Sequence, residues 1–128
     1  MVTSKKLEEY AKLLLKIITS SEIEDVNILF DRLKHHFYNK GRIFLSGNGG
    51  SASIANHAAT DLSKLTHNNT SLNSISLNSN ISLITAISND DGYENVFSNI
   101  IKNHDVNSSD TLITISSSGN SRNLMNLI

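Results

Sequence analysis

The sequence contains no cysteine and no proline among its 128 residues. Without cysteine, disulfide bonds and thiolate metal sites are excluded. The 11 basic and 12 acidic side chains nearly cancel, to a net charge of −1, so no overall attraction to nucleic acid or to a membrane surface is expected. No apolar run approaches the ~20 residues of a transmembrane helix, and the amino terminus lacks an apolar signal-peptide core. We therefore expect a cytoplasmic protein that binds neither nucleic acid nor membrane.

Two amphipathic helices are predicted at the amino-terminal end. Residues 4–19 carry apolar side chains at helical spacing after Ser4, a candidate N-cap. Residues 21–39 do the same between Ser21, which can cap the helix, and Gly41, which stops it. We expect the two helices to form a hairpin. Their apolar stripes are wide, which favours packing on more than one neighbour and therefore a subunit interface.

The pattern changes after residue 41, where short apolar runs alternate with turns and helical segments. Strands are predicted at 42–46, 74–77 and 111–115, and helices at 52–65, 81–87, 93–102 and from 123 onward, with 66–74 as a polar surface loop. This alternation predicts an α/β fold with a parallel sheet covered by helices on both faces. Three strands and an unfinished helix make a thin core. We therefore expect a single domain, with a hairpin at 1–40 and a core at 41–128 that is incomplete at its carboxyl end or completed by partners.

Two turns that follow predicted strands have the composition of anion-binding loops. One is the glycine loop 47–51, and the other is the serine-rich turn 116–121. Unpaired backbone N–H groups at a helix N-terminus attract negative charge, and serine hydroxyls can donate to phosphate without adding charge. Loops at the carboxyl ends of parallel strands converge on one ligand. The serine-rich turn is also what a simple helix cap would look like, so both interpretations stay open for the turn by itself.

Nucleotide binding is not favoured by either turn. The serine-rich turn has no lysine, so it is not a Walker A loop. Gly47, Gly49 and Ala52 fit the dinucleotide pattern G-x-G-x-x-A, which is weak by itself. The next strand runs into 78–80, Asn-Ser-Asn, where a dinucleotide site would need a carboxylate for the ribose.

Titratable and polar side chains add a possible reaction centre. His57 and Asp61 are spaced i, i+4 on a predicted helix, so they share one face and could supply two metal ligands or a base and its partner. An ordinary exposed pair has the same spacing. The turn 89–92 could contact a ligand between the two loops or merely cap a helix. The remaining histidines are interpreted as solvated surface residues, namely His35, His36, His67 and His104.

Taken together, three motifs in order resemble the sugar isomerase (SIS) domain family, most closely its phosphoheptose isomerase branch. They are 47–52 followed by 56–57 and Asp61, then 87–93, then 115–121. The resemblance covers essentially the whole chain. It implies a flavodoxin-like three-layer sandwich with a parallel sheet flanked by helices and an N-terminal helical hairpin. It also implies a cytoplasmic homotetramer that interconverts sedoheptulose 7-phosphate and D-glycero-D-manno-heptose 7-phosphate for the heptose of lipopolysaccharide or capsule.

The resemblance also implies roles for single residues. The substrate-binding residues would be Asn48, Gly49, Gly50, Ser51, Asn89 and Asp90, with Ser116, Ser117, Ser118 and Ser121 holding the phosphate. His57 and Asp61 would be zinc ligands and catalytic residues, with Asp61 as the base.

Two features depart from the family pattern. Asp61 stands where the family usually has glutamate, which is one methylene longer, and misplacement on that scale can cost ~10²-fold in rate. The family's later glutamine and histidine, which complete the Zn²⁺ site and supply the second acid or base, fall beyond Ile128. The alternative function is a non-catalytic SIS module that binds a phosphosugar or acts in assembly, as the family's replication-initiator-associating member does.

Overall fold

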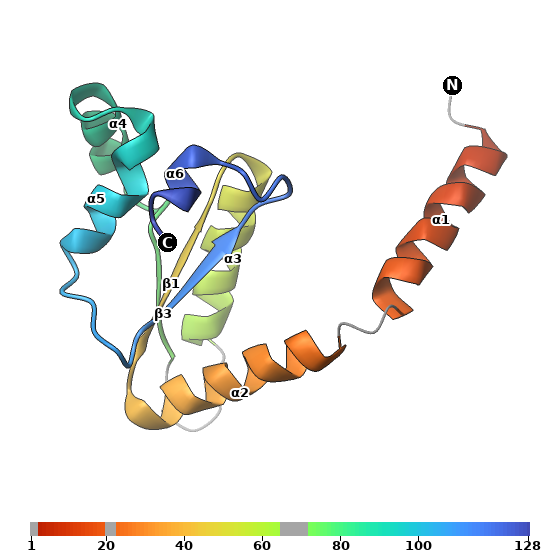
Figure 1. Cartoon of the computed structure of the whole chain (residues 1–128), viewed down its shortest axis with the longest axis horizontal. Helices are drawn as coiled ribbons and strands as arrows, with labels where there is room; N and C mark the ends of the chain where they lie inside the picture. The colour runs from red at the N-terminus through yellow and green to blue at the C-terminus, as the bar shows by residue number, and fades with distance from the viewer. Residues whose placement is uncertain (1–2, 20–22, 65–71) are drawn as a thin grey trace. The chain divides into compact units, whose positions relative to one another are not determined.

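The computed structural model describes residues 3–19, 23–64 and 72–128. The chain forms two compact units, Met1–Lys34 and His35–Ile128. Figure 1 colours the chain from its amino to its carboxyl end and labels the elements used below. The predicted division into a hairpin at 1–40 and a core at 41–128 places the boundary a few residues later than the one between these two units.

The first unit contains helix α1 (Ser4–Thr19) and the start of helix α2 (Ile23–Asn39). Helix α1 is capped by Thr3 rather than by Ser4, since the Thr3 Oγ1 accepts the N–H of Lys6 at 3.4 Å. None of the residues of α1 is buried, and its apolar side chains are largely exposed. The predicted hairpin packing stays a prediction, and the predicted cap Ser21 lies outside the described residues.

Helix α2 ends in the second unit through a left-handed turn. Lys40 takes the left-handed conformation with φ 56°, and the N–H of Gly41 bonds the carbonyl of His36 at 3.2 Å, the pattern of a Schellman cap. The expectation that Gly41 itself stops the helix is therefore only partly right. Glycine is required there because a Cβ would stand 1.9 Å from the carbonyl oxygen of Ser109.

The interpretation of His36 as a solvated residue was wrong, and that of His104 is only partly right because this residue is half-buried. His35 is exposed as expected, and His67 lies outside the described residues. His36 is 4% exposed, and its Nε2 lies against the hydroxyl of Thr111. The ring of His104 packs on Phe44, with 5.2 Å between the ring centres. Both histidines fill the amino-terminal end of the sheet, where the aromatic ring substitutes for an apolar side chain.

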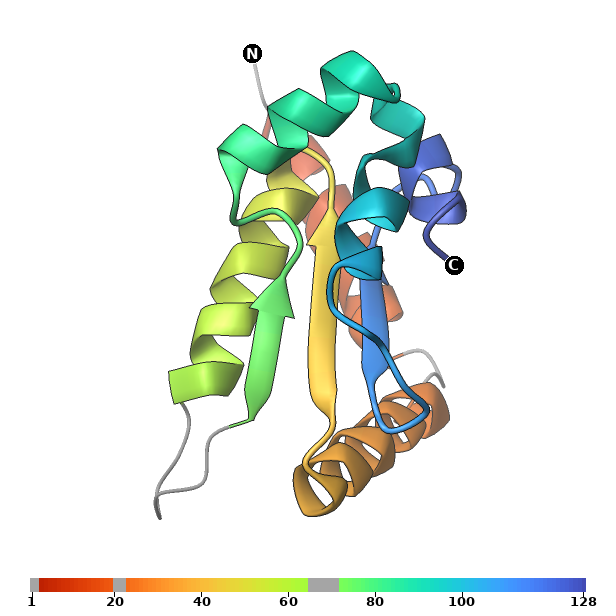
Figure 2. The same ribbon diagram turned by 90° about the vertical axis from the view of Figure 1, so that its left-hand side faces the viewer.

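The sheet has three parallel strands, β1 (Arg42–Gly47), β2 (Asn73–Ser76) and β3 (Thr111–Ile115). Their spatial order is β2-β1-β3, so β1 is central (Figure 2). Gly47 at the end of β1 pairs with Ile115 at the end of β3. Because the strands are parallel, all three carboxyl ends meet at one edge. The predicted strands and the parallel sheet are thus confirmed, with boundaries shifted by one residue.

Helices cover both faces of this sheet, as the α/β prediction requires. They are α3 (Gly50–Lys64), α4 (Ile81–Asp90), the 3-10 turn η1 (Tyr93–Asn95), α5 (Val96–Lys102) and α6 (Arg122–Met125). Helix α3 lies on one face, and α5 and α6 lie on the other (Figures 1 and 2). The predicted helix 93–102 is divided into η1 and α5, and α4 extends three residues past its predicted end.

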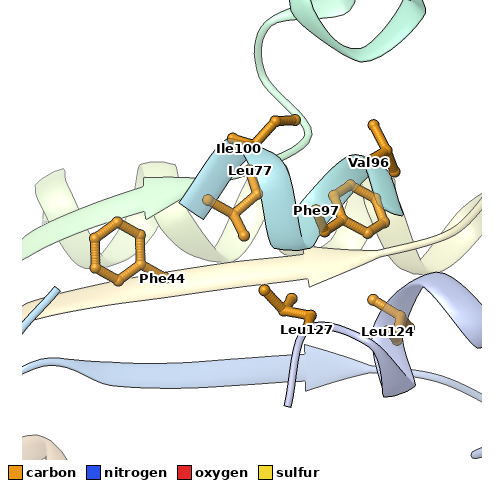
Figure 3. Packing of buried hydrophobic residues seen from close by; sticks show 7 residues of the cluster. All are labelled: Phe44, Leu77, Val96, Phe97, Ile100, Leu124 and Leu127. Carbon is orange, nitrogen blue, oxygen red and sulfur yellow. The ribbon is translucent and has the colours of Figure 1, made fainter. Parts of the chain in front are cut away.

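Alternation along β1 separates two sides of the core. Phe44 faces α5 and α6, where it joins a cluster with Leu77, Val96, Phe97, Ile100, Leu124 and Leu127 (Figure 3). Ile43 and Leu45 point to the opposite face, which α3 covers with the buried Ala55 and Ala59. Small side chains there let α3 approach the sheet closely, as the alanine content of this segment predicts.

An ion pair fixes the end of the sheet that lies away from the carboxyl ends of the strands. Arg42 contacts Asp110 with 2.6 Å between Nη2 and Oδ2, and its Nε donates to the second carboxylate oxygen. The Arg42 backbone N–H also donates to Asp110. These bonds from Arg42 hold the pKa of the Asp110 carboxyl at about 2, below its usual value of 3.8. The pair joins the starts of β1 and β3.

In the described part of the chain, no helix has the length and apolarity to cross a membrane.

Candidate active site

Two loops meet at the carboxyl edge of the sheet. One follows β1 and the other follows β3, and these strands are neighbours that are paired at Gly47 and Ile115. The chain turns from β1 toward β2 and then crosses back to β3, so the order reverses between β1 and β3. Open parallel sheets bind ligands at such a switch point. The structure therefore brings the predicted glycine loop and the predicted serine-rich turn to the position where a shared ligand is expected.

The glycine loop is fixed at its start by hydrogen bonds and is open to solvent further along. The side chain of Asn78, just after β2, accepts the N–H of Gly47 at 3.1 Å and donates to the Gly47 carbonyl at 2.9 Å. Gly49 adopts a left-handed φ of 54°, and the N–H of Ser51 returns to the carbonyl of Asn48 at 3.0 Å. A Cβ at Gly49 or Gly50 would meet nothing within 4 Å, so the backbone at these two residues borders open space.

The serine-rich turn presents hydroxyl groups that can donate to a ligand. The Ser116 Oγ accepts the N–H of Gly119 at 3.0 Å, and the Ser118 Oγ accepts the N–H of Asn120 at 3.2 Å. Each oxygen thus uses a lone pair inside the turn. The two hydroxyl oxygens also lie 3.4 Å apart, so one hydroxyl can donate to the other, and the second hydrogen can point to an incoming oxygen atom. Gly119 allows the turn to close through a left-handed φ of 66°.

Ser117 and Ser121 complete the predicted phosphate contacts. Ser117 is exposed. Ser121 precedes α6 and makes no side-chain capping bond there, so the hydroxyl is not used by the helix. Helix α6 has only four residues (Arg122–Met125), which makes its dipole weak. The anion-binding capacity of this turn therefore depends more on its hydroxyl and N–H groups than on the helix dipole.

A hollow of about 340 Å³ lies between the two loops. It is lined by Asn48, Tyr93, Glu94, Ser121, Arg122 and Asn123. The amides of Asn48 and Asn123 exchange two hydrogen bonds, each 2.8 Å long, and the hydroxyl of Tyr93 donates to the Asn48 Oδ1 at 2.8 Å. The glycine loop, η1 and helix α6 are therefore in direct contact at this hollow.

Asn89 and Asp90 lie at the exposed end of α4, where the Asn89 amide donates to the Asp90 carboxylate at 2.8 Å. The contact from this part of the chain to the glycine loop comes instead from η1, where the Tyr93 hydroxyl donates to the Asn48 Oδ1. The neighbouring Asp91 has a structural role, accepting from the side chains of Asn95 and Asn99. The substrate contacts predicted for Asn89 and Asp90 stay predictions.

His57 and Asp61 are in contact on α3, with 3.2 Å between Nε2 and Oδ2, and their side chains are 80% and 52% exposed. Gly50, Ile54, His57 and Asp61 are spaced i, i+4, i+7 and i+11, so they share one face of the helix. All four are exposed. This face begins at the glycine loop, and at 1.5 Å per residue His57 lies roughly 10 Å and Asp61 roughly 16 Å along it.

His57 and Asp61 supply two of the ligands that a zinc site needs. An imidazole nitrogen and a carboxylate oxygen are suitable zinc ligands, but a protein site needs at least three. Over the ranges 3–19, 23–64 and 72–128, no group of three or more histidine or acidic side chains is placed to hold a metal ion. The residues present therefore do not by themselves fit a zinc site.

Four functional candidates were missed from the sequence. Tyr93, Glu94, Arg122 and Asn123 all line the hollow. Asn123 precedes the buried Leu124 and lies i−4 from the buried Leu127, so a polar residue on the inner face of the last helix was a usable signal. Glu94 and Arg122 are exposed charges with nothing in their spacing to mark them.

Comparisons with known proteins agree with this geometry. The family model of the SIS domain matches residues 7–128. A phosphoheptose isomerase of Helicobacter pylori is 44% identical over 103 residues, which are 80% of this chain and 51% of that protein. A phosphoheptose isomerase from Colwellia psychrerythraea is 49% identical over 88 residues, which are 68% of this chain and 44% of that protein. The chain thus spans about half the length of these curated relatives.

Two solved structures have the same fold as this chain. A phosphoheptose isomerase from Francisella tularensis superposes with a TM-score of 0.74 at 26% identity, covering 99% of this chain and 68% of that one. The phosphoheptose isomerase of Neisseria gonorrhoeae superposes with a TM-score of 0.66 at 30% identity, covering 94% and 66%. The predicted flavodoxin-like α/β architecture, with its two N-terminal helices, is confirmed by these superpositions.

Proposed function

Since the chain belongs to the SIS domain family, we propose that it binds a phosphorylated sugar between its two loops. The reaction we propose is the interconversion of sedoheptulose 7-phosphate and D-glycero-D-manno-heptose 7-phosphate. Relatives named phosphoheptose isomerase support this choice of substrate. The alternative is a binding module without catalysis.

The observation that carries the proposal is the exposed face of α3. It starts at the open backbone of Gly50 and leads to the His57–Asp61 pair. A phosphate held at the loops could not itself reach Asp61, since roughly 16 Å of helix separates them. The carbon chain of a sugar phosphate would extend from the loops along this face toward His57, which lies roughly 10 Å along the helix. The Asp61 carboxylate would meet the carbonyl end there, because it lies 3.2 Å from the His57 ring.

The residues divide the chemistry into an anchor and a base. Ser116, Ser117, Ser118 and Ser121 would donate to the phosphate. Asp61 would remove a proton from C1 of the ketose and return one to C2, while the hydroxyl proton passes from O1 to O2 through an enediol. His57 would hold the Asp61 carboxylate through their contact of 3.2 Å. No step here is assigned to zinc, because the described residues supply only two ligands.

The proposal also includes the oligomeric state and the cellular location of the protein. A homotetramer is supported by helix α1, whose apolar side chains are exposed along its length, including Leu7, Tyr10, Leu14 and Ile18. Such surfaces are usually covered by a partner. We place the reaction in the cytoplasm, where it would supply heptose for lipopolysaccharide or capsule. Size-exclusion chromatography with light scattering measures the oligomer directly, and a monomer at micromolar concentration would contradict the tetramer.

The activity is tested by mixing the chain with sedoheptulose 7-phosphate, with and without Zn²⁺, and following the aldose product. The Asp61→Asn variant should abolish turnover while keeping phosphosugar binding, because the amide cannot accept the C1 proton. Asp31→Asn is a matched control, since Asp31 is an exposed helical carboxylate that pairs with Lys34 on the same helix. Turnover by Asp61→Asn at the native rate would refute the role of this base.

A specific observation favours the alternative function. The pair on α3 is exposed and short of a third ligand in the described residues, whereas the two loops are well formed. A non-catalytic module would bind sedoheptulose 7-phosphate without converting it. Binding by calorimetry together with no product over hours, from a sample of confirmed oligomeric state, would select this alternative.

A further inference from the structure

The side-chain amide of Asn48 is bonded on two sides. Its Oδ1 accepts from the Asn123 Nδ2 and from the Tyr93 hydroxyl, and its Nδ2 donates to the Asn123 Oδ1, all at 2.8 Å. The three residues come from separate segments: the loop after β1, the turn η1 and helix α6. Asn123 is only 3% exposed, so its half of the pair is fixed in the packed interior.

The number of lone pairs and hydrogens already in use shows whether the Asn48 amide can still donate or accept a hydrogen bond. An amide oxygen has two lone pairs, and an amide nitrogen has two hydrogens. Both lone pairs of the Asn48 oxygen are used, and one of the two hydrogens is used. The Asn48 amide therefore has one hydrogen left to donate, and this side chain lines the hollow between the loops.

We propose that Tyr93 and Asn123 are positioning residues that make Asn48 a donor of one N–H bond to an oxygen atom of the bound phosphosugar. Neither residue needs to touch the sugar for this role. Without them the amide could rotate by half a turn and present its oxygen, which would repel a ligand oxygen. This inference rests on the proposed binding of a sugar phosphate, and it adds which side of the Asn48 amide faces the ligand.

The first experiment is a ¹H–¹⁵N spectrum of side-chain amides in the full chain. The Asn48 pair of signals is identified by its loss in Asn48→Ser. In the free protein, Tyr93→Phe and Asn123→Ala should each shift this pair, because each removes a bonding partner. Adding sedoheptulose 7-phosphate should shift mainly one of the two Asn48 protons. Free-protein signals that are unchanged in both variants would overturn the proposal.

The second experiment measures the Kd of sedoheptulose 7-phosphate. Tyr93→Phe removes one hydroxyl and keeps the ring, and it should weaken binding roughly 2- to 10-fold, the usual value of one hydrogen bond. Tyr38→Phe is the matched control, because Tyr38 is 78% exposed on α2, and its Kd should equal that of the unmodified chain. Tight binding by Tyr93→Phe would overturn the proposal even if Asn123→Ala failed to fold.

The outcomes separate this inference from the proposed function. If the unmodified chain binds no sedoheptulose 7-phosphate, the proposed function fails, and the free-protein spectra alone decide whether Tyr93 and Asn123 hold the amide. If the chain binds the sugar phosphate and the chemical shifts of both Asn48 side-chain protons are unchanged, the proposed function stands and the N–H donor role is refuted.

Discussion

Replacing Gly50 with alanine separates the folding role of the glycine loop from its binding role. Gly50 is the first residue of α3, and a Cβ there would meet no atom within 4 Å. Alanine loses less backbone freedom on folding than glycine, so Gly50→Ala should stabilise the chain by up to about 1 kcal/mol. That gain corresponds to a rise in Tm of roughly 2–4 °C.

Ligand binding should change in the opposite direction. The added methyl group would occupy the open space beside the backbone N–H groups, where a sugar phosphate is proposed to lie. We expect calorimetry with sedoheptulose 7-phosphate to show a loss of at least about tenfold in affinity, which is about 1.4 kcal/mol. Ser53→Ala, at an exposed position of the same helix, is the control and should leave the affinity unchanged.

A more stable Gly50→Ala variant with native affinity would refute the reasoning. It would mean that the ligand does not approach the start of α3. Gly49→Ala gives a second comparison, since its left-handed φ of 54° should cost alanine roughly 1–2 kcal/mol. Loss of both stability and affinity is expected there, so only the Gly50 variant distinguishes the two roles.

Three further predictions concern the fold and the charge of the hollow. The low pKa of Asp110, about 2 against 3.8, means that its ion pair with Arg42 contributes fully above pH 4 and is lost as the pH falls through 2. Unfolding free energy should therefore drop by roughly 1–2 kcal/mol over that range, allowing for solvent screening, and urea titrations of Asp110→Asn should lack this drop. Phe97→Ala should cost about 3–5 kcal/mol because Phe97 is fully enclosed in the core, and a loss below 1 kcal/mol in urea would contradict the packing. Arg122→Gln should weaken phosphosugar binding roughly 2- to 5-fold at low salt, as expected for an exposed charge, and the difference should vanish at 1 M NaCl.

The strands and the two loops could be predicted from the sequence because their signals are local. The run 111–115 and the turn after it carry apolar and turn-forming residues in unbroken order. The rule that loops at the carboxyl ends of parallel strands converge then predicted a shared ligand site, and the structure brings the two loops to one sheet edge.

Features that depend on distant partners could not be predicted in this way. His36 looks like a surface residue in its own helix, and only the approach of Thr111, 75 positions later, explains its burial. The same separation hides the partnership of Asn48 with Asn123. The 3-10 turn at Tyr93 has the composition of the helix that follows it, so its different hydrogen bonding left no signal.

The 75-residue separation between Asn48 and Asn123 also has a consequence for folding kinetics. Contacts between distant positions form late, because the loop between them must close first. During synthesis, the glycine loop leaves the ribosome long before its amide partner exists. Strand β1 can therefore begin to collapse with α3, but the Asn48 amide acquires its final orientation only when α6 docks. Competence to bind ligand would then depend on the docking of α6, and chains folded only as far as β1 and α3 would be unable to sequester the sugar phosphate.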